Sequence, residues 1–249
     1  MSAASKSGTL VLLRHGQSTA NAAGLFTGLE DVPLTTTGRV EAAAAARLLI
    51  AGNLWPDVWV ASPLRRARQT ADIVAREAGR APALVRDDWR LSERNYGALT
   101  GRSKAEVLAK YGQAQFLSWR RSVDDAPPPM TELKRGMLPV AVAHPELGFT
   151  ESLRDVIGRV GDCYQELVIP TLAAGASMLV IAHGNSLRAL CAIIDRLSDD
   201  EIRALNLPTG QPLVYCVKAD GTPVERGGRY LDPITAKAAA FAIAHEGGT

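Results

Sequence analysis

The chain has 249 residues, of which 47% are hydrophobic and 22% are charged, a balance that excludes a disordered chain and is typical of a globular protein. Its 28 lysines and arginines against 26 acidic residues give a net charge of +2, far from the strongly basic footprint of proteins that bind duplex nucleic acid. An anionic ligand must therefore be met by locally clustered charge, and we expect one domain over residues 1–249.

Short apolar runs predict strands, which in chain order are residues 10–13, 58–61, 177–182 and 213–217. The first run leads into Arg14, His15 and Gly16, and the third leads into His183 and Gly184. Both therefore end in a histidine followed by a glycine.

Helices are predicted at 40–51, 63–78, 150–174 and 186–197. Ser62 before Pro63 predicts a capping side chain at the start of the second helix, and Pro170 predicts a kink or an end near the last turn of the third. Ser103 and Ser198 each open a capping box, and Gly112 could close the first of these two helices. The alternation predicts an α/β fold, a mainly parallel sheet with helices on both faces.

Two segments depart from this alternation. Residues 122–149 are rich in proline and show no clear period, which predicts a long loop or lid rather than core. Residues 235–249 are rich in alanine and predict a weak helix followed by a mobile tail.

The cysteines and the N-terminus indicate a cytoplasmic protein. Cys163, Cys191 and Cys216 lie far apart without a CxxC pair, so neither a disulfide framework nor a zinc site is indicated. The apolar run at 10–13 is too short for a signal peptide or a membrane span, and we expect no contact with a membrane.

Charged residues gather where the predicted strands end. In an open α/β sheet ligands bind at the carboxyl ends of the strands, where we expect His15, His183, Arg14 and Arg66. A single histidine is more commonly a capping or core residue, but this matched placement favours a site for a phosphate-like anion. Arg65 and Arg66 point about 100° apart on a helix, and we choose Arg66.

Several motifs occur together in a fixed order. The segment at 12–18 contains Arg14-His15-Gly16, which resembles the signature of the histidine phosphatase superfamily. Further segments resemble the 2,3-bisphosphoglycerate-dependent phosphoglycerate mutases: Phe26-Thr27-Gly28, Ser92-Glu93-Arg94-Asn95-Tyr96-Gly97, Tyr111-Gly112, Trp119-Arg120-Arg121, Thr150-Glu151-Ser152-Leu153, His183 to Ala189 and Asn206 to Gly210. The resemblance covers residues 9–232.

The resemblance implies a role for each matching position. His15 would be the nucleophile that becomes phosphohistidine, Glu93 the proton donor and acceptor, and His183 a stabiliser of the transferred phosphoryl group, assisted by Arg14 and Arg66. Spacing alone does not favour Glu93 over Asp87 or Asp88. The implied substrate-binding residues are Arg14, His15, Gly16, Gln17, Ser18, Asn21, Thr27, Gly28, Arg66, Glu93, Arg94, Asn95, Tyr96, Lys104, Arg120, Arg121, Gly184 and Asn185.

The resemblance also implies the reaction and its partners. The implied reaction is the interconversion of 3-phosphoglycerate and 2-phosphoglycerate, which is primed by 2,3-bisphosphoglycerate and needs no metal. The implied assembly is a homodimer or higher homo-oligomer, and no binding of nucleic acid is expected. Departures from the family pattern are Gln17 where glutamate is common, Asn95 where histidine is common, and a shortened segment at 122–149 that lacks a Tyr-Pro-Gly-His stretch.

Two other functions compete with the mutase. A phosphatase of the same superfamily would use water as the acceptor, but it would not need Lys104, Arg120 and Arg121 as a second anion clamp. A non-enzymatic phosphoprotein or nucleotide-binding module is disfavoured because no Walker loop and no GxGxxG motif follows the first predicted strand.

Overall fold

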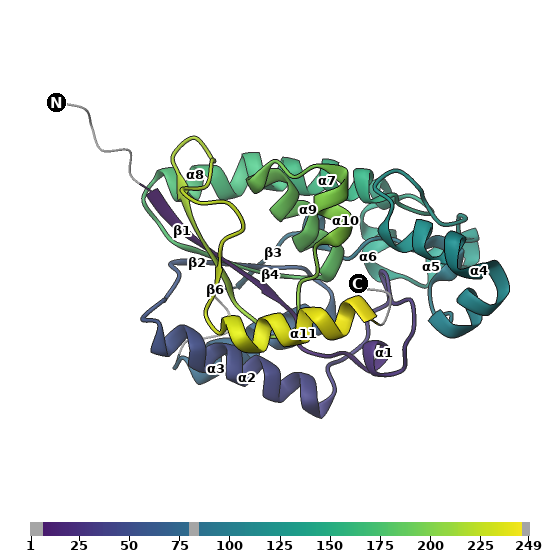
Figure 1. Ribbon diagram of the computed structural model, residues 1–249, viewed down its shortest axis with the longest axis horizontal. Coiled ribbons are helices and arrows are strands. Elements are labelled where there is room, and N and C mark those ends of the chain that lie inside the picture. The colour runs from purple at the N-terminus through teal and green to yellow at the C-terminus, as the bar shows by residue number, and fades with distance from the viewer. Residues whose placement is uncertain (1–6, 80–84, 246–249) are drawn as a thin grey trace.

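A six-stranded sheet forms the centre of the computed structural model, which describes residues 7–79 and 85–245 (Figure 1). The strand order is β3-β2-β4-β1-β5-β6. Strands β1 to β4 run parallel, whereas β5 pairs antiparallel with β1, and β6 antiparallel with β5. The strands are β1 Ser7–Arg14, β2 Val58–Ala61, β3 Val85–Asp87, β4 Met178–Ala182, β5 Leu213–Lys218 and β6 Arg229–Tyr230. The predicted mainly parallel sheet is confirmed, although β3 and β6 were not predicted because they are short edge strands without an apolar run.

Helices connect these strands and flank the sheet. The α-helices are α1 Thr19–Ala22, α2 Thr36–Ala51, α3 Arg65–Glu77, α4 Lys104–Arg121, α5 Glu132–Gly136, α6 Pro139–Ala143, α7 Leu153–Cys163, α8 Ile169–Ala173, α9 Gly184–Asp195, α10 Asp199–Ala204 and α11 Pro233–His245. Turns of 3-10 helix occupy Trp89–Leu91, Gly97–Leu99 and Pro145–Leu147, and Tyr164–Val168 forms a π-helical turn.

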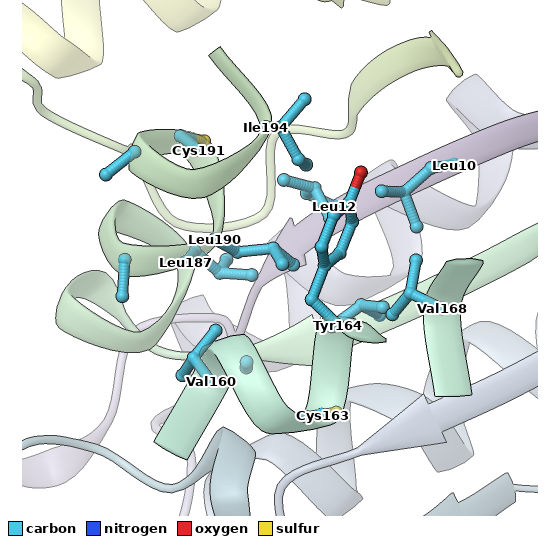
Figure 2. Packing of buried hydrophobic residues seen from close by; sticks show 14 of the residues in the cluster. Leu10, Leu12, Val160, Cys163, Tyr164, Val168, Leu187, Leu190, Cys191 and Ile194 are labelled. Carbon is cyan, nitrogen blue, oxygen red and sulfur yellow. The ribbon is translucent and has the colours of Figure 1, made fainter. Parts of the chain in front are cut away.

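Alternate side chains of β1 enter different cores, because successive residues of a strand point to opposite faces of the sheet. Leu10 and Leu12 belong to the larger cluster, which includes residues from α7, α9 and the π-helical turn (Figure 2). Val11 and Leu13 belong to a second cluster with residues from α2 and α3. The predicted placement of helices on both faces is therefore confirmed.

The prediction that residues 122–149 contribute nothing to a core is wrong, whereas a role of this segment as a lid stays a prediction. This segment contains α5, α6 and a 3-10 turn, and Met130, Leu138 and Leu147 are buried in a cluster of their own with Leu29 and Leu64. These short elements contribute few buried side chains: α5 contributes none, α6 contributes Val140 and Ala141, and the 3-10 turn contributes Leu147. The sequence consequently shows no regular hydrophobic period, although the segment is packed.

The single long helix predicted at 150–174 is interrupted. Helix α7 begins at Leu153 after the N-cap Ser152, and the π-helical turn Tyr164–Val168 separates it from α8. Pro170 lies in the first turn of α8, and its missing N–H removes one helical hydrogen bond, which accounts for a local change of helix type.

Other helix boundaries also differ from the prediction. Helix α3 begins at Arg65 with Leu64 as its N-cap, so Ser62 is not the capping residue. Gly112 has φ 77° and ψ 164°, which are not helical, so the first part of α4 ends there as predicted and a second part follows after a kink and continues to Arg121. In the C-terminal segment, the predicted helix is confirmed as α11, and residues 246–249 of the predicted tail lie outside the described residues.

Candidate active site

The two histidines of the sequence motifs lie next to each other because β1 and β4 are parallel neighbours. Arg14 is paired with Ala182 in the sheet register, so the next residues, His15 and His183, leave the sheet side by side. The backbone N–H of His15 donates a hydrogen bond to the carbonyl of Ala182 at 3.0 Å. The imidazole centroids are 4.9 Å apart, with an angle of 62° between the rings.

Hydrogen bonds define which nitrogen of His15 carries the proton and which carries the lone pair. Its Nδ1 lies 2.7 Å from the carbonyl oxygen of Gly16, which can only accept, so Nδ1 carries the proton in the neutral ring. The Nε of Arg66 donates to Nε2 of His15 at 3.2 Å. Nε2 therefore presents its lone pair toward the arginine cluster, as a nucleophile for a bound anion requires.

Burial keeps both imidazoles neutral. The pKa of His15 is lowered well below its usual value by desolvation and, to a lesser extent, by the positive charges of Arg66 and Arg14. The pKa of His183 is lowered well below its usual value by the same kind of burial, with Arg66 as the next cause. A neutral His15 retains the lone pair that nucleophilic attack on phosphorus needs.

Two buried arginines line the same pocket. Arg66 is anchored by donating to the carbonyls of Glu30 at 2.8 Å and Gly28 at 2.9 Å, and burial lowers its pKa to about 10, so it stays protonated at neutral pH. Arg14 donates to the carbonyl of Leu207 at 2.7 Å. Its buried Nε finds no hydrogen-bond partner in the part of the chain that the structure describes. A buried donor without a partner is costly, and a bound anion would satisfy it.

Ser62, which the sequence analysis assigned to a helix cap, instead contacts His183. Its hydroxyl lies 2.8 Å from Nε2 of His183 and accepts a hydrogen bond from the backbone N–H of Leu64 at 3.3 Å. Ser62 and His183 are both fully buried. The hydroxyl fixes the orientation of the second imidazole, and the signal in the sequence was only its position at the end of β2.

Glu93 comes to the pocket from the irregular segment between the 3-10 turns Trp89–Leu91 and Gly97–Leu99. One carboxylate oxygen accepts a hydrogen bond from the backbone N–H of Arg94 at 2.6 Å, and the other accepts one from the backbone N–H of Asn185 at 3.5 Å. The carboxyl group is thereby held across the pocket from β1, at the start of α9.

One pocket brings together most of the predicted site residues. Its lining consists of Arg14, His15, Asn21, Leu25, Phe26, Thr27, Gly28, Arg66, Glu93, Tyr96, Lys104, Arg120 and Asn185. Leu25 and Phe26 were not predicted, because apolar side chains carry no charge signal. His183 is not part of the lining, although its ring contacts that of His15.

The cations Lys104 and Arg120 come to this pocket from α4, which is remote from the sheet. The guanidinium carbon of Arg120 lies 5.1 Å from the centroid of the Phe116 ring, and the side chain is buried. Nearby, the amide of Asn185 donates to the hydroxyl of Tyr96 at 2.9 Å. The pocket therefore has positive charge at two places, one on β1 and α3 and the other on α4.

Several residues predicted to bind substrate do not line the pocket. Gln17 interacts with Thr35 and Glu41, Ser18 caps α1, and Gly184 begins α9 without lining the pocket. Gly16 lies against the N-terminus of α2, where an added Cβ would be 2.1 Å from the carbonyl oxygen of Gly38. These residues shape the strand end that carries His15.

Three further predicted residues make contacts away from the pocket. Arg121 donates to the carbonyl of Arg203 and to the side chain of Asn206, both at 2.9 Å. Arg94 donates to the carbonyls of Glu151 at 2.8 Å and Asp125 at 2.7 Å. Asn95 accepts from the backbone of Gly97 at 3.0 Å and donates to the carbonyls of Leu147 and Gly148.

A buried ion pair beside the pocket was missed. Arg159 and Glu151 are 8% and 6% exposed and are 2.7 Å apart at their closest atoms. Glu151 belongs to one of the family-like motifs, but no role had been assigned to it, and Arg159 lies on the predicted helix without any sequence signal that distinguishes it from a surface arginine.

Two features are absent from the described residues. Within 7–79 and 85–245, no group of three or more His, Cys, Asp or Glu side chains is placed to hold a metal ion. In the same part of the chain, no helix is both long and apolar enough to cross a membrane.

The chain belongs to the histidine phosphatase superfamily (branch 1), whose family profile matches residues 10–226. It is 48% identical over 96% of its length to the 2,3-bisphosphoglycerate-dependent phosphoglycerate mutase of Thermobifida fusca, covering 99% of that protein. It is 46% identical over 97% of its length to the enzyme of the same name from Corynebacterium efficiens, covering 98% of that protein.

Solved structures of a hydrolase and of a phosphatase share the fold. A mycobacterial hydrolase is 28% identical with a TM-score of 0.70, over 90% of this chain and all of that chain. The mycobacterial glucosyl-3-phosphoglycerate phosphatase in complex with VO3 is 29% identical with a TM-score of 0.64, over 84% of this chain and 92% of that chain.

Proposed function

We propose that this protein interconverts 3-phosphoglycerate and 2-phosphoglycerate by way of a phosphohistidine at His15, as a 2,3-bisphosphoglycerate-dependent phosphoglycerate mutase. The observation that carries the proposal is the double cationic pocket: Arg14 and Arg66 beside His15, and Lys104 and Arg120 on α4. Two separated positive groups suit a ligand with two anionic ends. Full-length similarity to enzymes of this name, at 46–48% identity, supports the same conclusion.

The first half of the reaction moves a phosphoryl group to His15. The lone pair on Nε2 forms a bond to phosphorus while the ester P–O bond breaks, and the departing glycerate oxygen takes a proton from the Glu93 carboxyl group. The guanidinium groups of Arg14 and Arg66 stabilise the charge on the equatorial oxygens. A neutral His183 beside His15 supports the transferred group without adding a further positive charge that would raise the cost of burial.

The second half reverses these roles. The Glu93 carboxylate removes the proton from whichever glycerate hydroxyl faces His15, and that oxygen attacks the phosphohistidine. Lys104 and Arg120 are suited to the carboxylate or the second phosphate, since a guanidinium can hold such groups through two parallel hydrogen bonds. Asn185 and Tyr96 complete this end of the pocket.

The residues present fit 2,3-bisphosphoglycerate. The unsatisfied Nε of Arg14 indicates an anion at one end, and the cations of α4 suit an anion at the other. When bound, this compound supplies the phosphoryl group that charges His15 before the first turnover. No metal is part of the proposed mechanism, and we expect activity to survive EDTA.

The strongest alternative is a phosphatase, which the name of one structurally similar protein, the glucosyl-3-phosphoglycerate phosphatase, favours. Water would then accept the phosphoryl group, and the α4 cations would have no required role. The experiment measures 2-phosphoglycerate and inorganic phosphate in one reaction that starts from 3-phosphoglycerate, with and without added 2,3-bisphosphoglycerate. A mutase forms 2-phosphoglycerate, responds to the primer and releases little phosphate. Equal rates of both products, without an effect of the primer, would establish the phosphatase.

We also infer a cytoplasmic homo-oligomer of two or more copies. The location follows from the proposed substrates, which are glycolytic intermediates, and the assembly follows from the family resemblance. Light scattering coupled to size-exclusion chromatography measures the number of copies directly.

A further inference from the structure

The Arg159–Glu151 ion pair contacts the backbone of the segment that carries Glu93. The guanidinium of Arg159 donates to backbone carbonyls of Arg90 at 2.5 Å, Ser92 at 2.9 Å and Glu93 at 3.2 Å. These are consecutive or nearly consecutive residues on the approach to the carboxyl group. One side chain on α7 thus fixes the course of an irregular backbone.

Glu151 orients this guanidinium and also binds the backbone of the segment that carries Glu93. Its carboxylate oxygens accept from Nε of Arg159 at 2.7 Å and from a terminal nitrogen at 3.0 Å, the paired geometry that specifies a guanidinium plane. One of these oxygens also accepts from the backbone N–H of Asn95 at 2.7 Å. The pair therefore holds the backbone on both sides of Glu93.

The position of Glu93 needs such support because regular structure does not supply it. Residues 92–96 lie between two single 3-10 turns and belong to no strand or helix. A proton donor and acceptor must lie within hydrogen-bond reach of the oxygen that leaves or attacks. A misplacement of about 1 Å can cost on the order of 100-fold in rate.

We propose that Arg159 and Glu151 are positioning residues for proton transfer by Glu93. The ion pair acts through the backbone of residues 90–95 and touches neither substrate nor phosphoryl group. This inference rests on the proposed function, in which Glu93 protonates the glycerate oxygen as the phosphoryl group moves to His15.

The test compares two phosphoryl donors in a single turnover of His15 phosphorylation. The glycerate oxygen of 2,3-bisphosphoglycerate is a poor leaving group and needs the proton from Glu93, whereas the nitrophenolate of 4-nitrophenyl phosphate leaves without one. In Arg159→Lys, we expect phosphorylation by 2,3-bisphosphoglycerate to slow by about 100-fold and phosphorylation by 4-nitrophenyl phosphate to change little. Lysine keeps the charge beside Glu151 but cannot reach several carbonyls at once, so it should not rescue the function.

A second variant and a matched control keep the test decisive. Glu151→Gln preserves the shape of the side chain, removes its charge and should show the same selective loss at a smaller size, even if Arg159→Lys fails to fold. Arg154→Met removes another arginine of α7, one that is 58% exposed and paired with Asp124, and should affect neither donor.

The outcomes distinguish a failure of the positioning role from a failure of the proposed function. Equal loss with both donors, or no loss in Glu151→Gln, would overturn the positioning role, because a merely structural pair would not distinguish the leaving groups. If the wild-type protein forms no phosphohistidine from 2,3-bisphosphoglycerate, the proposed function itself fails before any variant is compared.

Discussion

The pocket has one wall built on the sheet and one built on irregular chain, and the two are held in place by different forces. His15 and His183 follow paired strands, and Arg66 lies in the first turn of α3, which packs on the same sheet. Glu93 lies on a segment without regular structure, which is fixed by buried side-chain hydrogen bonds to backbone carbonyls. Regular structure thus positions the phosphoryl acceptor, and charged side chains position the proton donor.

The difference shows how the position of each group of catalytic side chains is fixed. A strand ladder fixes neighbouring residues through many backbone hydrogen bonds, so no single side chain decides the distance between the histidines. The irregular wall depends on a few arginines and carboxylates, each of which satisfies several partners. Substitutions should therefore affect the two walls in different ways.

The largest effect is expected at the sheet-borne wall. His15→Asn removes the covalent carrier, and no neighbouring side chain can replace it, so turnover should fall by on the order of a million-fold. Acid-labile, alkali-stable phosphate should form on the wild-type protein and be absent from the variant. Equal labelling of both proteins would show that His15 is not the acceptor.

The next effect concerns the small core beside the irregular wall, in which the carbonyl of Leu147 accepts a hydrogen bond from Asn95. Leu147→Ala opens a cavity in the small cluster formed with Leu29, Leu64 and Leu138, and should lower the free energy of unfolding by about 2–5 kcal/mol. Leu133→Ala, at a side chain that is 74% exposed, is the control and should change it by less than about 0.5 kcal/mol. Urea unfolding measures both variants. A loss at Leu147 no larger than at Leu133 would mean that this cluster is not a true core.

Much of the sheet-borne wall was predictable from the sequence. Apolar runs that end in His-Gly mark strands whose carboxyl ends meet, and this predicted the convergence of His15, His183, Arg14 and Arg66. The irregular wall was not predictable from pattern, because Glu93 is equivalent to Asp87 and Asp88 until the chain is folded, and only the family resemblance distinguished it. Arg159 was missed because a buried arginine and an exposed one look alike in a sequence.

The same argument explains the error at residues 122–149. Hydrophobic periodicity detects elements long enough to repeat, whereas α5 and α6 have only five residues each. The buried side chains of α6 and of the residues around it have partners as distant in the sequence as Leu29 and Leu64. No local pattern contains that information.

A smaller effect should separate the two cationic ends of the pocket. Lys104→Met removes one cation of α4 and should raise KM for phosphoglycerate by about 10-fold, which corresponds to about 1.4 kcal/mol, with little change in His15 phosphorylation by 4-nitrophenyl phosphate. Lys110→Met on the exposed side of the same helix is the control. An unchanged KM would remove Lys104 from the proposed substrate contacts.

A further effect is the pH dependence of stability. The pKa of His183 is lowered in the folded protein by burial, so the unfolded chain binds more protons below the ordinary value of 6.5. Stability should therefore be unaffected by this residue above that pH and should decrease as the pH falls below it, by up to about 1.4 kcal/mol per pH unit. Urea unfolding between about pH 7 and pH 5 should show a shallower decrease for His183→Asn than for the wild-type protein. Identical slopes would mean that His183 is protonated in the folded state.

The hydrogen bond from the amide of His15 to the carbonyl of Ala182 has a consequence for motion. This bond continues the ladder between β1 and β4, and β1 is paired on its other edge with β5. Opening a central strand requires breaking bonds on both edges and exposing two cores, so its amides should exchange with solvent only when the whole molecule unfolds. The two imidazoles then stay together for as long as the protein is folded. We therefore expect any opening that admits substrate and releases product to occur outside the sheet, at α4, which carries Lys104 and whose amides should exchange before those of β1.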